Sequence, residues 1–192
     1  MYGWTKLMEE MTLEIYFKDW GMKSPSCRYF TVYRRLEHED QSVLAMIARA
    51  LIMQDPFVVW GNGVQLRNWT HVRDIVSRMI LTPEKIDDDT AVNLRKAERT
   101  RVLDAVPEVL RYAGHKARIE LQSEIPTGPK NQVADNSVAR GLLGWEPRGM
   151  FMDGLRTTID WYFSTKDRDK ARQIVERTLS YRVTKSASAA LA

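Results

Sequence analysis

The sequence predicts an α/β protein, because segments with helical spacing of apolar residues alternate with short segments rich in β-branched and aromatic residues. Helical spacing runs through residues 2–20, and a strand pattern follows at 27–33. A helix over 41–53 and a strand over 57–60 repeat the alternation. We therefore expect helices packed on a sheet rather than an all-helical bundle or an all-β sandwich.

Composition favours one globular domain, or one domain with a small appendage. The chain has 192 residues, of which 44% are apolar and 28% are charged, as is usual for globular proteins. We find no apolar run long enough to span a membrane and no signal-peptide pattern. Cys27 is the single cysteine, so an internal disulfide is excluded and a cytoplasmic location is expected. The net charge of +4 is spread among acidic residues, which argues against a nucleic-acid-binding surface.

The first predicted helix ends at Gly21, a usual residue at a helix C-terminus. After the strand at 57–60, the run Gly61-Asn-Gly63 signals a tight turn, with 65–70 as the returning strand of a hairpin. The remaining predicted helices cover 74–81, 100–113, 137–143 and 152–163, and the remaining strands cover 91–94 and 117–121. Pro83 is expected in a loop, and Pro107 is expected to kink or split its helix.

The end of the chain differs from the rest. Residues 166–182 are strongly charged and predict an exposed helix, and residues 183–192 are small and predict a flexible tail. We therefore expect residues 1–165 to form the functional part of the chain.

Tyr2 and Lys6 form the first candidate site. They stand four residues apart at the head of a predicted helix, so their side chains lie on one face, a turn apart. A phenol has a reference pKa of about 10 and is a poor base at neutral pH. A neighbouring ammonium favours the phenolate and lowers that pKa, so the pair is suited to proton transfer.

A metal site is not expected. His38, His71 and His115 are scattered, with no ligand spacing to one another or to Cys27. The Asp87–Asp89 cluster is followed by no further ligands at calcium-loop spacing and is expected to be a solvated loop.

Four stretches together resemble the extended short-chain dehydrogenase/reductase family, which includes the NAD-dependent nucleotide-sugar epimerases and dehydratases. The resemblance covers residues 1–163, in order. Its stretches are Tyr2-x-x-x-Lys6 with Glu10, Arg28-Tyr-Phe-Thr-Val-Tyr33, Trp60-Gly-Asn-Gly-Val-Gln-Leu-Arg67 through Asp74, and Ala134 through Pro147 with Gly154 through Tyr162. It implies the C-terminal part of a Rossmann-type domain: the catalytic helix, the last sheet strands and the small substrate-binding lobe.

The resemblance also implies residue roles. Tyr2 would be the general acid or base at a sugar hydroxyl, and Lys6 would lower its pKa and hydrogen-bond the nicotinamide ribose. NAD would take a hydride from the sugar and usually return it. Arg67 would bind the nucleotide diphosphate, which suits the planar fork of a guanidinium. Asn93 would lie near the same diphosphate, and Thr31 stands where the family usually has a substrate-contacting asparagine.

The glycine-rich dinucleotide fingerprint of the family, G-x-x-G-x-x-G, is absent from the chain. We therefore expect a truncated C-terminal half of an epimerase or dehydratase. Two alternatives stay open: an inactive remnant that binds a nucleotide sugar or a partner protein, and a subunit completed by a separate cofactor-binding chain. The family often dimerises through the helix bearing its tyrosine and lysine, so the resemblance also implies a homodimer through residues 3–20.

Overall fold

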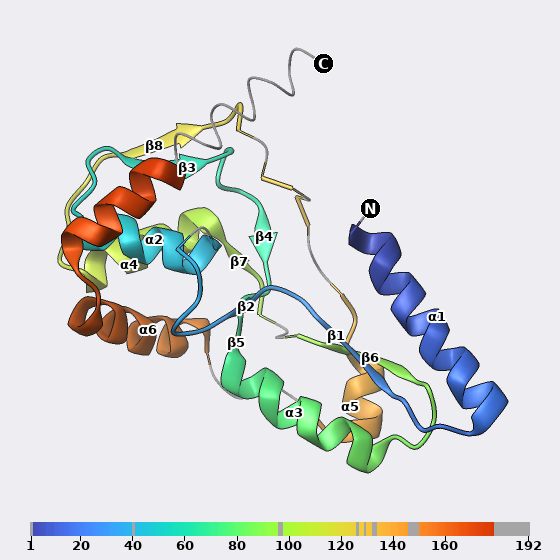
Figure 1. Cartoon of the computed structure of the whole chain (residues 1–192). Helices are drawn as coiled ribbons and strands as arrows, with labels where there is room; N and C mark the ends of the chain where they lie inside the picture. Colours follow the sequence, from blue (N-terminus) through green and yellow to red (C-terminus); the bar gives the residue numbers. More distant parts are fainter. Residues whose placement is uncertain are drawn as a thin grey trace. The chain divides into compact units, whose positions relative to one another are not determined.

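The computed structural model describes residues 2–39, 41–95, 98–125, 127–128, 130–131, 134–145 and 150–178, with the side chain of Tyr2 left out. The helices are α1 (Tyr2–Trp20), α2 (Ser42–Leu51), α3 (Val72–Lys85), α4 (Val102–Tyr112), α5 (Ser137–Leu143) and α6 (Phe151–Thr165) (Figure 1). The strands are β1 (Ser26–Tyr29), β2 (Val32–Tyr33), β3 (Phe57–Trp60), β4 (Leu66–Arg67), β5 (Thr70–His71), β6 (Ala91–Leu94), β7 (Thr100–Arg101) and β8 (Ile119–Gln122). The predicted tail, 183–192, and the end of the predicted 166–182 helix lie outside the described residues.

The chain forms two compact units that interleave along the sequence. Unit 1 comprises Met1–Val32, Asn68–Glu98 and Val133–Gly149. Unit 2 comprises Tyr33–Arg67, Arg99–Gln132 and Met150–Ala192. Each unit therefore brings together segments that are far apart in the sequence.

Unit 1 is built on a parallel pair of strands. β1 and β6 align from Ser26 opposite Ala91 to Tyr29 opposite Leu94, and α3 and α5 pack against them. Cys27 of β1 packs against a core of apolar side chains from β6, from both helices and from the residues just after each helix: Ile75, Ile86, Val92, Leu94, Ala139, Leu143 and Trp145. The parallel pairing agrees with the predicted α/β class, because parallel strands need a long connection between them.

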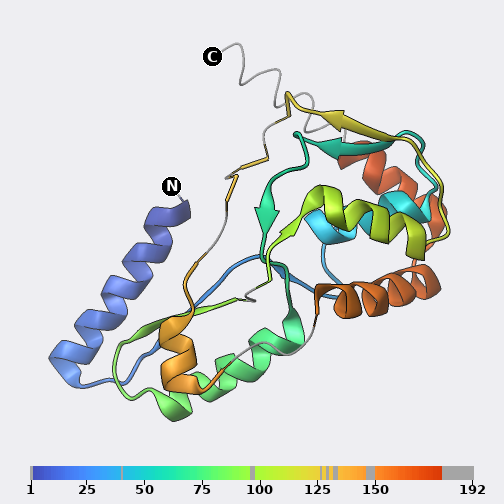
Figure 2. The ribbon, with the colours of Figure 1, turned by 180° about the vertical axis from the view of Figure 1, so that it is seen from behind.

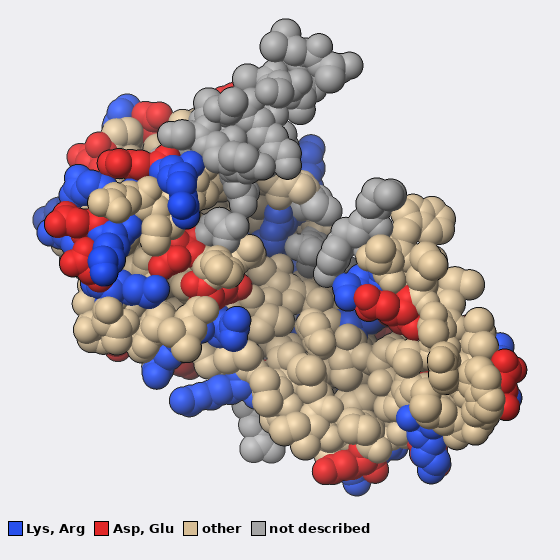
Figure 3. All heavy atoms as spheres, viewed as in Figure 1, with Lys and Arg blue, Asp and Glu red and all other residues tan. Residues whose placement is uncertain are grey.

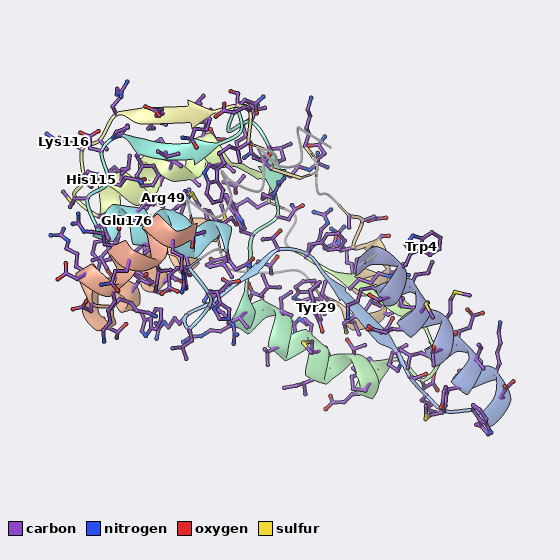
Figure 4. The ribbon with its side chains drawn as sticks, turned by 45° about the horizontal axis from the view of Figure 1, so that its top comes forward. Trp4, Tyr29, Arg49, His115, Lys116 and Glu176 are labelled. Atoms are coloured by element: carbon purple, nitrogen blue, oxygen red, sulfur yellow. The ribbon has the colours of Figure 1, made fainter. Side chains whose placement is uncertain are left out.

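α1 is a 19-residue helix of unit 1 that ends at Gly21. Gly21 has a left-handed backbone, with φ of 64°, and its N–H donates to the carbonyl of Phe17 over 2.8 Å. Much of the apolar surface of α1 is exposed: Trp4, Leu7, Met8, Met11, Ile15, Tyr16 and Trp20. Figure 4 shows Trp4 on the first turn of α1 and Tyr29 at the end of β1. No helix in the described part of the chain is long and apolar enough to span a membrane.

Unit 2 contains a second parallel pair, β3 and β8, which run side by side in Figures 1 and 2. α2, α4 and α6 pack on one another. Every residue of α2 from Val43 to Ala50 is buried, which is more than the one-sided face expected from its periodicity. Such a helix lies in the middle of its layer rather than on the surface.

The hairpin predicted after β3 is wrong. β3 pairs with β8, and β4 pairs with β7 in antiparallel register, with Arg67 opposite Thr100. Gly61 and Gly63 both have positive φ, but close approach of other segments also requires them to be glycine. A Cβ at Gly61 would lie 2.6 Å from the side chain of Thr127, and one at Gly63 would lie 2.4 Å from that of Leu103.

Three other predictions need correction. α3 continues past Leu81 to Lys85, so Pro83 lies inside its last turn and not in a loop. The predicted strand at 27–33 is divided into β1 and β2. The predicted exposure of the charged C-terminal helix is wrong for part of it, because residues 168–178 are helical and bury Ala171 and Val175. Charged residues dominated the pattern there, but apolar side chains four residues apart were enough to bury one stripe.

Candidate functional site

The start of α1 carries the predicted catalytic pair. Tyr2 is the first residue of the helix, and Lys6 lies one turn later. The Lys6 side chain is exposed, and its Nζ lies 2.8 Å from Oε2 and 3.0 Å from Oε1 of Glu9. A surface ion pair of this kind contributes about 0–1 kcal/mol, so a competing ligand at the lysine costs little.

Glu10 joins α1 to the neighbouring strand. Nε of Arg28, in β1, donates to Oε1 of Glu10 over 2.7 Å, and Nη2 of Arg28 also donates to Oε2. These hydrogen bonds lower the pKa of Glu10. Arg28 is the register partner of Asn93 on β6, so their side chains lie on the same face of the strand pair. The bidentate ion pair between Arg28 and Glu10 thus connects β1 to α1, the helix that carries Lys6.

Asn93 is bound within unit 1. Its Nδ2 donates to the backbone carbonyl of Asp135 over 2.6 Å. The Asp135 carboxylate accepts hydrogen bonds from the backbone N–H and the hydroxyl of Ser137, the first residue of α5, over 2.9 and 2.7 Å. The Ser137 bonds lower the pKa of Asp135. Asn93 therefore links β6 to the segment that begins α5.

Thr31 lies in the break between β1 and β2 and is half-buried. Its backbone carbonyl accepts a hydrogen bond from the N–H of Thr70 over 3.0 Å. This contact ties the break to β5 within unit 1.

Arg67 ends β4 in unit 2 and is half-buried. Its Nη1 donates to the carbonyl of Leu66 over 2.9 Å, and its Nη2 donates to the carbonyl of Thr127 over 2.7 Å. These two acceptors are neutral carbonyl oxygens. Burial lowers the pKa of the Arg67 guanidinium from its usual value. Because the group stays protonated at neutral pH, a bound anion would offset the cost of burying its charge.

The predicted site residues are divided between the units. Lys6, Thr31 and Asn93, with the backbone of Tyr2, belong to unit 1, and Arg67 belongs to unit 2. Sequence reasoning missed the Glu10–Arg28 ion pair, although Glu10 stands four residues after Lys6. It also missed the backbone carbonyl of Thr127. The sequence contains no signal for this contact, because every residue has a backbone carbonyl.

The described residues fit NAD only in part. A dinucleotide pyrophosphate is usually held where a strand leads through a glycine-rich turn into a helix N-terminus. In the described part of unit 1, β1 is followed by Phe30 and β6 by Arg95, so neither strand enters such a turn. Lys6, with an exposed ammonium, is suited to a ribose hydroxyl. Among the described residues, no group of three or more His, Cys, Asp and Glu side chains is arranged to hold a metal ion.

The sequence profile of one protein family, GDP-mannose 4,6 dehydratase, matches residues 1–158. The chain belongs to this family. The predicted resemblance to NAD-dependent nucleotide-sugar epimerases and dehydratases is thereby confirmed, together with the α/β, Rossmann-type fold class.

Two similar proteins agree with this assignment. An uncharacterized UDP-glucose epimerase, YtcB, of Bacillus subtilis is 32% identical over 165 residues, which are 85% of this chain and 52% of the relative. A UDP-glucuronate 4-epimerase of Thermodesulfobacterium geofontis is 29% identical over 161 residues, 83% of this chain and 49% of the relative. The chain spans about half the length of the curated relatives it matches.

Solved structures show the same fold. UDP-glucuronic acid 4-epimerase from Bacillus cereus, in complex with UDP-glucuronic acid and NAD, superposes with a TM-score of 0.78 at 28% identity and covers 86% of this chain and 53% of its own. dTDP-glucose 4,6-dehydratase from Bacillus anthracis, in complex with NAD, has a TM-score of 0.73 at 20% identity over 81% of this chain and 50% of its own. NAD is thus the cofactor of these neighbours.

Proposed function

We propose that this chain carries the substrate-binding and proton-transfer residues of an NAD-dependent epimerase or dehydratase acting on a nucleotide-activated sugar. Membership of the family supports the reaction class. The observation that carries the proposal is the geometry of Arg67, whose guanidinium is half-buried and held by two backbone carbonyls. A cation fixed in this way is ready to bind a diphosphate without further loss of side-chain freedom.

In the proposed reaction, Tyr2 takes a proton from a sugar hydroxyl or returns it. Lys6 stabilises the phenolate and donates to the cofactor ribose. For this, the Lys6 ammonium leaves its exposed ion pair with Glu9, which is a small cost for a surface contact. When bound, NAD supplies the transient hydride acceptor.

Asn93 and Thr31 have supporting roles in this proposal. The Asn93 amide group donates one of its two N–H bonds to the Asp135 carbonyl, so its second N–H and its side-chain oxygen are suited to contact substrate. Thr31 offers a hydroxyl where the family usually has an asparagine, which retains a hydrogen-bonding group at that position.

We further propose a homodimer through residues 3–20. The exposed apolar side chains of α1, with Trp4 and Met8 at 70% and 65% exposure, support such an interface. In the face shown in Figure 3, much of the surface of unit 1 carries no charged side chain, which agrees with an apolar contact.

Calorimetric titration of the 192-residue chain with UDP and with GDP tests the proposed substrate site. We expect at least one of the two to bind, and Arg67→Ala to weaken that binding about 10- to 100-fold, the loss typical of a charge-assisted hydrogen bond. Arg73→Ala, at an exposed arginine of α3, is the matched control and should bind as the parent chain does. Equal affinity of the parent chain and Arg67→Ala would contradict the assignment.

Turnover is tested with UDP-glucose, UDP-glucuronate and GDP-mannose at millimolar NAD, with products separated by chromatography. Tyr2→Phe keeps the ring and removes only the hydroxyl. We expect it to lower turnover by a factor of about 10² to 10⁴, the usual contribution of a general acid or base. A turnover that Tyr2→Phe leaves unchanged would assign the proton transfer to another group.

A further inference from the structure

Arg67 donates two of its hydrogen bonds to different parts of unit 2, one to its own strand and one to Thr127. Leu66 is the residue before Arg67, so the bond from Nη1 to its carbonyl is local and does not depend on the packing of other segments. The Thr127 carbonyl is 60 residues away, so its position relative to Arg67 depends on tertiary packing. A second backbone bond, from the N–H of Leu66 to the carbonyl of Lys130 over 3.0 Å, also joins β4 to this later part of the chain.

Thr127 also packs on Gly61, at the end of β3. The N–H of Gly61 donates to the carbonyl of Gln122 over 2.8 Å, which fixes the glycine to the end of β8. A Cβ built on Gly61 would lie 2.6 Å from Cγ2 and 3.3 Å from Oγ1 of Thr127. Any side chain at position 61 would therefore push Thr127 away. The Thr127 side chain has little freedom to turn aside, because its branched Cβ restricts χ1.

We propose that Gly61 and Thr127 are positioning residues for the Arg67 guanidinium. Gly61 leaves the space into which Thr127 packs, and the packed Thr127 presents its backbone carbonyl to Nη2. Neither residue needs to touch substrate for this role. The functional consequence rests on the proposed function, because it matters only if Arg67 binds the diphosphate.

NMR of the guanidinium tests the positioning directly in the full chain. Two carbonyl acceptors slow rotation of the guanidinium, so the Arg67 Nη protons should give separate signals, assigned by their loss in Arg67→Ala. We expect Gly61→Ala to average these signals. The double variant Gly61→Ala/Thr127→Ala should restore them, because the nearest remaining atom, Cβ of residue 127, lies 3.6 Å away. Signals that stay separate in Gly61→Ala would overturn the proposal.

Gly114→Ala is the matched control. Gly114 has a positive φ of 65°, against 74° at Gly61, but a Cβ there meets no atom within 4 Å. The variant therefore carries the same kind of backbone strain as Gly61→Ala without its clash. We expect it to lose thermal stability and to keep the Arg67 signals. Averaged signals in this control would trace the effect to backbone strain and would also overturn the proposal.

Nucleotide binding separates this inference from the proposed function. Using UDP and GDP as probes, we expect Gly61→Ala to weaken binding about five- to tenfold, and the double variant to recover it, as for loss of one hydrogen bond to a charged group. If Arg67→Ala does not weaken binding, the proposed function fails while the NMR result still decides the positioning. If Arg67→Ala weakens binding and Gly61→Ala does not, the positioning role fails alone.

Discussion

At the scale of the residue, the Lys6 side chain has to exchange one partner for another in the proposed reaction. It forms an ion pair with Glu9 in the structure, and the proposed reaction requires it beside the Tyr2 phenol and the cofactor ribose. Both arrangements lie on the same helical face, because positions 2, 6 and 9 are three or four residues apart. An exposed pair of this kind is easily exchanged for another partner.

Lys6→Met should lower turnover roughly a hundredfold and move the acidic limb of its pH profile upward, because the limb where activity rises reports formation of the Tyr2 phenolate. The reason is that a phenol without a neighbouring ammonium returns toward its reference pKa of about 10. A pH–rate series with the substrate that the chain turns over measures both effects. Lys18→Met, which breaks the Lys18–Glu14 pair on the same helix, is the control and should leave the profile in place. An unchanged profile for Lys6→Met would remove the lysine from the proton transfer.

At the scale of the element, one partly buried carboxylate connects the loop after β2 to the end of α6 in unit 2. Oε1 of Glu39 accepts hydrogen bonds from Nζ of Lys166 over 3.0 Å and from the hydroxyl of Tyr162 over 3.3 Å. Burial by itself raises the pKa of Glu39, but the Lys166 bond, a backbone bond and the Tyr162 bond lower it overall. Burial and the nearby Glu39 charge also raise the pKa of Tyr162, so its hydroxyl stays a donor.

Glu39→Gln should destabilise unit 2 by about 1–3 kcal/mol at pH 7, since it removes a charged partner from a half-buried ammonium. A carboxyl whose folded pKa is depressed stabilises the protein above its unfolded pKa and loses that contribution as pH falls through the folded value. The difference between the parent chain and Glu39→Gln should therefore shrink as the pH is lowered below about 4.5. Urea unfolding at pH 7 and pH 3.5 measures this difference in the free energy of unfolding. Glu124→Gln, at an exposed position, should leave the free energy of unfolding unchanged at both pH values.

At the scale of the whole molecule, unit 1 exposes apolar side chains on more than one helix. Met11 and Ile15 on α1 are 53% and 52% exposed, and Val76 and Ile80 on α3 are 45% and 62% exposed. Each pair stands four residues apart on one helical face. The exposed fractions alone therefore do not show whether α1 or α3 forms an interface. The proposed dimer uses α1.

Met11→Glu/Ile15→Glu should convert a dimer of the chain to a monomer, because two carboxylates would face an apolar interface. The Val76→Glu/Ile80→Glu variant has the same charge and spacing on α3 and should remain a dimer. Sedimentation equilibrium measures the mass of both. A monomeric parent chain, or dissociation by the α3 variant alone, would contradict an interface through residues 3–20.

Local pattern predicted most elements of this protein. α5 was predicted with its observed bounds, and α1 and β6 likewise follow from periodicity and strand-forming residues. The spacing of Tyr2 and Lys6 on one helix is equally a local property. Membership of the family also follows from the sequence, because the motif stretches occur in order.

Only the tertiary structure decided which strands pair and what holds each functional side chain. The hairpin signal at Gly61–Gly63 is local, yet the pairing partners of β3 and β4 are β8 and β7, which lie much later in the chain. The same holds for the Thr127 carbonyl at Arg67 and for Arg28 at Glu10. Side-chain periodicity reports which face is buried, whereas pairing and hydrogen-bond partners depend on contacts between distant segments that form only when the chain packs.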